Sequence, residues 1–207
     1  QGSLFSISNV IIQSSVNSFG SIAVSGNAAA GNIEGFVYTS MNSVTQSALN
    51  FTGQNHGAKN FDRVKKTSFI SLGFVFLVGL VLGVSAYIFS RPLLSIYIFD
   101  SEEAIRYGVT RLLYISVPYC LCGIMDVSTG LLRGLGSSVM PMIITVAGVC
   151  GFRIVWIYSV FSMPQYHTLE VLYISYIISW TMTFIVQIVL FVILYCIKKK
   201  NAINAIK

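Results

Sequence analysis

The chain has 207 residues, of which 55% are hydrophobic and only 10% are charged, and its formal net charge is +6. Soluble domains carry about 25% charged residues, so a water-covered globular domain is excluded and most of the chain must face lipid or neighbouring helices. The basic residues lie between apolar segments, as in the cytoplasmic loops of membrane proteins, and nucleic acid is therefore not predicted as a partner.

A transmembrane helix needs about 20 mostly apolar residues, and the chain contains six segments of suitable length. We predict an all-α membrane protein, a six-transmembrane-helix bundle over residues 1–200 with membrane lipid as its surroundings, and a cytoplasmic tail over 201–207. The predicted spans are, in chain order, 3–19, 28–51, 67–90, 104–132, 139–163 and 169–197.

The first two segments are rich in polar residues, which recur at steps of three and four and therefore lie on one face of each helix. Such stripes are typical of helices around a polar cavity, and hydrogen bonding between helices is the alternative interpretation. The predicted cavity-lining residues are Ser6, Asn9, Gln13 and Asn17 in the first segment and Thr39, Ser43, Gln46 and Asn50 in the second.

The connections and glycines predict how the spans follow one another. Residues 53–66 form a polar, basic loop, and Asp100 with Glu103 is typical of a helix N-cap before the fourth span. The pairs Gly79-x-x-x-Gly83 and Gly130-x-x-x-Gly134 indicate close approach of helix backbones. We expect Pro118 to kink the fourth span.

Two carboxylates fall within predicted spans, Glu34 in the second and Asp126 in the fourth. A charged group at the bilayer centre costs about 2.5–3.5 kcal/mol on insertion scales, so it usually has a function. For both we predict coupling to a cation or proton. The alternative for Asp126 is a structural hydrogen-bond acceptor, and the alternative for Glu34, nearer the end of its helix, is a contact with lipid headgroups.

Arg153 lies within the fifth span, where we predict a structural role, either pairing with a carboxylate of another helix or extending along apolar surface. Arg133 ends the fourth span and is assigned a structural role at the following turn. The histidines, His56 and His167, lie in loops at opposite faces, so no metal is predicted beyond Na+ at Asp126.

Orientation follows from the Lys and Arg residues, which accumulate in the 53–66 loop, the 133–138 turn and the C-terminal segment. The positive-inside rule places these three regions in the cytoplasm and predicts a multi-pass protein of the cell membrane. No phosphate-binding, metalloprotease or nucleophile-elbow motif is present, so the sequence argues against an enzyme, and no cofactor is predicted.

Several stretches are similar to the multidrug and toxic compound extrusion (MATE) family: GQNHGAKNFDRVKK (53–66), MDVSTGLLRGLGSSVMPMI (125–143), FRIVW (152–156) and LEVLYISYIISW (169–180). The resemblance implies the C-terminal six-helix lobe of a twelve-helix, two-lobe transporter that works by alternating access. It also implies a missing N-terminal lobe of the same polypeptide and small organic cations as substrates.

The resemblance implies a coupling carboxylate a few residues before the Leu-Arg-Gly turn, and Asp126 occupies that place. The chain departs from the family in its first helix, where many members carry a glutamate and this sequence has none. We therefore expect half of an antiporter that exports drugs and other organic cations in exchange for Na+ or H+. The alternatives are a flippase for lipid-linked saccharide or polymer precursors, whose anionic cargo calls for Arg and Lys in the cavity, and a membrane scaffold that does not transport.

Overall fold

The computed structural model describes residues 2–204, with side chains from residue 9 onward, and every regular element in this range is helical. The elements are α1 Gly2–Asn17, α2 Ser21–Gly57, α3 Phe61–Ile88, α4 Ser90–Leu94, α5 Glu102–Arg111, η1 Leu112–Ser116, α6 Tyr119–Gly134, α7 Val139–Thr145, η2 Val146–Gly151, α8 Phe152–Trp156, η3 Ile157–Phe161, η4 Pro164–Tyr166 and α9 Leu169–Asn204. The chain is thus an all-α membrane helical bundle, as predicted.

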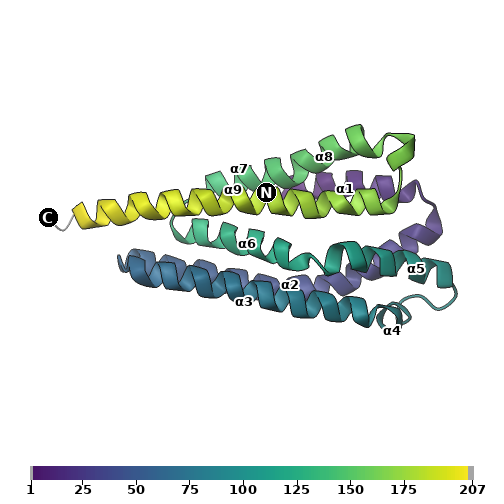
Figure 1. The fold of residues 1–207 in the computed structure, drawn as a ribbon, viewed down its shortest axis with the longest axis horizontal. Helices are drawn as coiled ribbons and strands as arrows, with labels where there is room; N and C mark the ends of the chain where they lie inside the picture. Colours follow the sequence, from purple (N-terminus) through teal and green to yellow (C-terminus); the bar gives the residue numbers. More distant parts are fainter. Residues whose placement is uncertain (1, 205–207) are drawn as a thin grey trace.

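The helices run roughly parallel and antiparallel along one long axis, with α6 in the middle of the bundle (Figure 1). Helix α6 packs against α2, α3 and α9, and the continuous helical segment from α7 to η3 lies along α9. Helix α1 contacts α2, η2 and α8. Side chains from most of the chain can therefore meet around α6.

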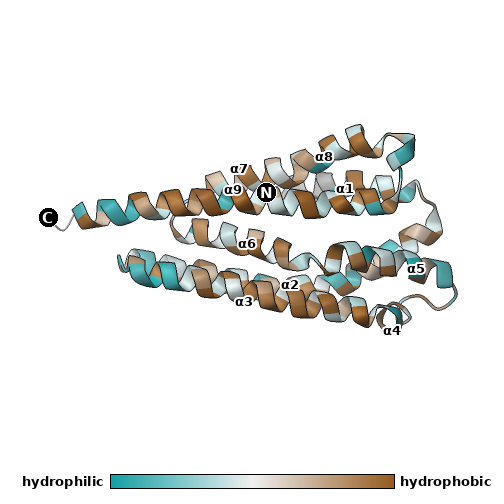
Figure 2. Ribbon diagram, viewed as in Figure 1, coloured by the Kyte–Doolittle hydropathy of each residue, from teal (hydrophilic) through white to brown (hydrophobic). Residues whose placement is uncertain are grey.

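Three helical segments are long and apolar enough to cross a membrane: Phe61–Ile88, Val139–Phe161 and Leu169–Asn204. The pair Glu102–Ser116 and Tyr119–Gly134 qualifies as one span bent by 45°, with the bend next to Pro118. Figure 2 shows the mainly apolar residues along α3 and α9 giving way to hydrophilic residues at one end of the bundle. Helices α1 and α2 are too polar or too short for this test, so the count of six spans stays a prediction.

The polar segment 53–66 is largely helical, which differs from the predicted loop. Helix α2 continues to Gly57, and α3 begins at Phe61. The Asn60 side chain accepts a hydrogen bond from the backbone N–H of Arg63 at 3.1 Å and so caps α3. The segment contains no proline, so both helices extend into it, and the break between them is confined to residues 58–60.

The N-cap of the fourth span lies one residue later than predicted. Ser101, rather than Asp100, accepts a hydrogen bond from the backbone N–H of Ala104, at 3.1 Å, and α5 begins at Glu102. Serine and aspartate are about equally good N-caps, so the sequence alone did not decide between these neighbours.

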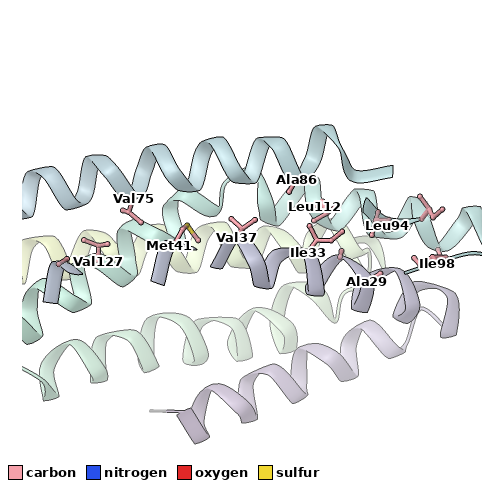
Figure 3. Packing of buried hydrophobic residues seen from close by; sticks show 14 of the residues in the cluster. Ala29, Ile33, Val37, Met41, Val75, Ala86, Leu94, Ile98, Leu112 and Val127 are labelled. Atoms are coloured by element: carbon pink, nitrogen blue, oxygen red, sulfur yellow. The ribbon is translucent and has the colours of Figure 1, made fainter. Parts of the chain in front are cut away.

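One apolar core joins α2 to α3, α5 and α6 (Figure 3). Four of its α2 residues recur every four positions and therefore lie on one face of the helix. These four are Ala29, Ile33, Val37 and Met41, all buried. The polar stripe of α2 lies on the opposite, exposed face.

The glycine pairs lie at backbone contacts, as the sequence indicates. A side chain at Gly79 or Gly83 would meet the backbone of Cys120 or Ser116, on the span that packs against α3. A side chain at Gly130 would meet the backbone of Thr45 in α2. These contacts hold α6 closely between α2 and α3.

Candidate functional site

A cavity of about 510 Å³ lies beside α6 and holds Asp126. Six elements contribute to its wall, so it forms only when the bundle is assembled. Its lining residues are Asn9 of α1, Tyr38 of α2, Tyr119, Cys122, Met125 and Asp126 of α6, Val149 of η2, Arg153 of α8, and Tyr176 and Trp180 of α9.

Asp126 is partly buried in this wall, about two helical turns before the end of α6. The hydroxyl of Tyr38, which lines the same cavity, is a neighbouring hydrogen-bond donor for its carboxylate. Tyr38 itself is 41% exposed, and Asn9 nearby is also exposed. The Asp126 carboxylate therefore has a neutral donor beside it and an open side facing the cavity.

Arg153 contributes the second charge of the cavity and is only 5% exposed. Its Nε donates a hydrogen bond to the Ser179 hydroxyl at 3.1 Å. The guanidinium carbon lies 3.7 Å from the ring centroid of Tyr176 and 5.7 Å from that of Trp180. No carboxylate among the described side chains forms an ion pair with Arg153, so the predicted pairing is not found.

Glu34 lies in a different cluster, joined to Arg111 by a two-pronged ion pair. The Nε and Nη2 atoms of Arg111 donate to the two carboxylate oxygens of Glu34 at 2.8 and 2.7 Å. The Nη1 atom donates to Asn27 Oδ1 at 2.5 Å, and the Tyr173 hydroxyl donates to the same oxygen at 3.0 Å. Both oxygens of Glu34 are thus engaged, while its predicted coupling role stays a prediction.

The predicted cavity-lining residues separate into several groups. Asn9 lines the Asp126 cavity, and Ser43 lines another cavity of about 670 Å³ between α2 and α3. The side chain of Ser6 lies outside the described residues. The remaining five are exposed on the surfaces of α1 and α2: Gln13, Asn17, Thr39, Gln46 and Asn50.

Hydrogen bonds within single helices satisfy part of these stripes. Thr39 donates to Gly35 O, and Ser43 donates to Thr39 O, each within α2. Gln13 donates to Asn17 within α1 and accepts a 3.4 Å bond from Asn27 of α2. The bonds of Thr39 and Ser43 stay within α2, and for its stripe both cavity lining and hydrogen bonding between helices stay predictions.

Sequence reasoning did not find the aromatic part of the site. Tyr176 and Trp180 lie four residues apart on α9 and contact Arg153 on the adjacent helix. Their spacing, together with an arginine inside the preceding span, is a readable signal for a shared face. Tyr38 could not be recognised in this way, because the residues next to it in the sequence were assigned to the predicted polar stripe of α2.

Comparison with known proteins gives consistent matches. The family model MatE matches residues 2–159. A probable multidrug resistance protein of Bacillus subtilis, YoeA, is 27% identical over 170 residues, which cover 82% of this chain and 36% of that protein. The chain thus spans about a third of the length of this curated relative.

Solved transporter structures share the fold. The Vibrio cholerae MATE transporter VcmN in its bent form superposes with a TM-score of 0.83 at 18% identity, over 94% of this chain and 44% of that one. A MOP superfamily transporter from Pyrococcus furiosus gives a TM-score of 0.85 at 14% identity, over 95% of this chain and 44% of that one. The helical bundle and the match to the family model both indicate the same family. The chain belongs to the MATE family of multidrug and toxic compound extrusion transporters.

Proposed function

We propose that the chain is one six-helix lobe of a secondary antiporter that exports cationic amphipathic compounds in exchange for Na+ or H+. The observation that supports this most directly is the Asp126 carboxylate in a cavity walled by aromatic rings. Aromatic faces attract organic cations. A carboxylate away from bulk water is disfavoured as a bare anion, so it holds a proton or a cation and exchanges one for the other.

The cargo path in this proposal lies between this lobe and a second one. Two-lobe transporters place their sites at the interface of the repeats and expose them alternately to each side. The exposed polar faces of α1 and α2, which carry Gln13 and Gln46 among others, supply a surface suited to such an interface. Binding of the coupling ion shifts the equilibrium between the two states through its differential affinity.

The flippase alternative is less well supported by the cavity. A pyrophosphate-linked cargo carries at least two negative charges and requires several basic groups. The cavity contains one arginine, Arg153, and one carboxylate, Asp126. Their formal charges cancel, which does not favour a strongly anionic cargo.

The substitution Asp126→Asn tests the coupling role in the two-lobe protein. Asparagine keeps the size and one acceptor oxygen but cannot ionise. We expect normal insertion and expression with loss of ion-driven efflux of a cationic dye across the tested pH range, measured in everted vesicles. Efflux with wild-type ion dependence would refute the coupling role.

Two controls accompany that measurement. Glu34→Gln is the matched variant on the other carboxylate, and loss of coupling there with normal folding would transfer the role to Glu34. Residues 1–207 alone should insert but show no efflux, because half of the cargo path is then absent.

We also propose that the polar end of the bundle, with the link between α2 and α3 and the end of α9, lies in the cytoplasm. Single cysteines at Lys59, Lys200 and Glu102, in a background that lacks the four native cysteines, test this orientation. An impermeant thiol reagent outside intact cells should label the Glu102 position and spare the other two. The reverse labelling pattern would invert the orientation.

A further inference from the structure

A groove of about 400 Å³ lies between α3 and α9, at the end where both helices become hydrophilic (Figure 2). Most of its wall is apolar, and its charged residues lie at one end. The wall includes Phe69 and Leu72 of α3 and Ile188 and Val192 of α9, with Lys65 and Lys199 at the charged end. None of its residues lines the Asp126 cavity, so the groove is a separate site.

The groove has the depth of one membrane leaflet. Along α3 it extends from Asp62 to Leu72, which is about 15 Å at the rise of an α-helix. Along α9 it extends from Ile188 to Lys199, which is about 16 Å. The hydrocarbon core of a bilayer is about 30 Å thick, so the groove matches the acyl region of a single leaflet.

The apolar wall of the groove is open to the surroundings of the bundle. Phe69 is 69% exposed and Val192 is 52% exposed. Both residues belong to helices that are long and apolar enough to cross a membrane. Water needs polar partners that such a wall does not offer, so an acyl chain fits this recess better than water does.

Contacts between α3 and α9 fix the charged end of the groove. Lys199 Nζ lies 3.1 Å from Asp62 Oδ1, and the Tyr195 hydroxyl donates a hydrogen bond to the Phe61 carbonyl at 3.1 Å. Lys65 forms no ion pair with the described side chains. The Asp62 side chain is 89% exposed, so its pair with Lys199 is a weak surface contact that a phosphate can share.

The segments around this end carry an excess of positive charge. Residues 59–66 contain four basic residues and one acid, and residues 198–200 are all lysine. Basic residues beside membrane spans, and basic pockets between such spans, are typical of sites for anionic lipid headgroups. A lysine contacts phosphate as a point charge, which suits a headgroup that lies between two helices.

We propose that this groove binds an anionic phospholipid. One acyl chain lies along Phe69, Leu72 and Val192, and the headgroup phosphate lies between Lys65 and Lys199. A net negative headgroup complements this end, whereas the choline of phosphatidylcholine cancels the charge of its phosphate. With the orientation proposed above, the lipid belongs to the cytoplasmic leaflet.

Cys196 provides a local readout, because it lines the groove and is exposed, whereas Cys120, Cys122 and Cys150 are buried. The two-lobe protein is stripped of lipid in an uncharged detergent, and phosphatidylglycerol or phosphatidylcholine is then added in increasing amounts. Peptide mass spectrometry follows the reaction of Cys196 with a maleimide. We expect phosphatidylglycerol to slow this reaction at a several-fold lower concentration than phosphatidylcholine does.

Removal of the two groove lysines should weaken this protection. Lys65→Gln combined with Lys199→Gln should raise the half-protecting concentration of phosphatidylglycerol on the order of tenfold to thirtyfold, at about fivefold per basic residue. Lys66→Gln combined with Lys200→Gln is the matched control, because it removes the same charge from the same segments outside the groove. We expect a clearly smaller effect there, with each variant compared with its own lipid-free rate.

Two further substitutions test the acyl chain and the headgroup. Val192→Trp fills the groove and should weaken protection, whereas Val189→Trp should not, since Val189 is equally exposed on α9 but lies outside the groove. Asp62→Asn removes the partner of Lys199 and should strengthen protection by phosphatidylglycerol.

Each other outcome would overturn the proposal. Equal protection by the two lipids, or equal effects of the two double lysine variants, would show that the groove does not select an anionic headgroup. Equal effects of Val192→Trp and Val189→Trp would show that no acyl chain occupies it. Weaker protection by phosphatidylglycerol in Asp62→Asn would show that the acid, rather than the lysines, contacts the headgroup. The proposed transport function is tested separately by Asp126→Asn and does not depend on these results.

Discussion

Two polar clusters lie inside the same bundle, and each contains a carboxylate and an arginine. In the Glu34 cluster the arginine uses Nε, Nη1 and Nη2 for hydrogen bonds, and both carboxylate oxygens accept. In the Asp126 cavity the two charges form no ion pair with each other, and about 510 Å³ of space adjoins them. The first cluster has little bonding capacity left, and the second retains it.

This difference indicates how to separate structural from functional charges in a membrane bundle. A buried charge whose partners satisfy it contributes to the fold, whereas a buried charge kept apart from its opposite must be retained for another reason. The Glu34 cluster joins α2, α5 and α9 through Arg111, Asn27 and Tyr173. The Asp126 cavity is lined by α1, α2, α6, η2, α8 and α9, and its two charged groups form no ion pair with each other.

The largest expected effect is on stability and comes from breaking the closed ion pair. Arg111→Met leaves the buried Glu34 carboxylate without its partner, which should destabilise the fold by about 3–5 kcal/mol. Arg153→Met leaves no carboxylate unpaired and should lie within about 1–2 kcal/mol of the wild type. Thermal unfolding of the purified protein in detergent measures both.

A double substitution separates charge burial from lost packing. Arg111→Met combined with Glu34→Met removes both charges and should recover most of the stability lost in Arg111→Met. If Arg111→Met and Arg153→Met lower the unfolding temperature equally, the distinction between the clusters is wrong.

The fold and the position of Asp126 could be predicted from the sequence, because membrane-spanning segments are runs of apolar residues, and a charged residue or a proline within such a run is recognised from the sequence alone. Asp126 inside an apolar span and Pro118 beside the bend are examples. The Glu34–Arg111 pair could not be predicted, since its residues are 77 positions apart and nothing local joins them. In lipid, apolar residues face outward as well as inward, so hydropathy does not fix how a helix is rotated about its axis.

That ambiguity explains why Arg153 was assigned to a structural pair and Tyr38 was not assigned at all. The stripe on α2 could be recognised because polar residues, unlike apolar ones, mark one face of a helix. Its members Thr39 and Gln46 are both exposed. Helix α9 contributes Tyr176 and Trp180 to the cavity wall. Aromatic rings can face lipid, the protein core or a cavity, so these two residues could not be assigned from the sequence.

The smallest expected effect compares one tyrosine from each cluster. Tyr173→Phe removes a hydrogen bond to Asn27 inside the closed cluster and should lower stability by about 0.5–1.5 kcal/mol, with no change in coupling. Tyr38→Phe removes the hydroxyl beside the Asp126 carboxylate, and the exposed position of Tyr38 predicts no measurable change in stability.

The effect of Tyr38→Phe should instead appear in the ion dependence of efflux. We expect the Tyr38 hydroxyl, as the donor beside the Asp126 carboxylate, to compete with the coupling ion for a carboxylate oxygen. Without it, the ion concentration that gives half-maximal efflux should fall, by up to about tenfold for a difference of about 1.4 kcal/mol. Unfolding curves and ion titrations of both phenylalanine variants provide the comparison. If Tyr38→Phe destabilises the protein as much as Tyr173→Phe and leaves the ion titration unchanged, the cavity is a second closed cluster rather than an open site.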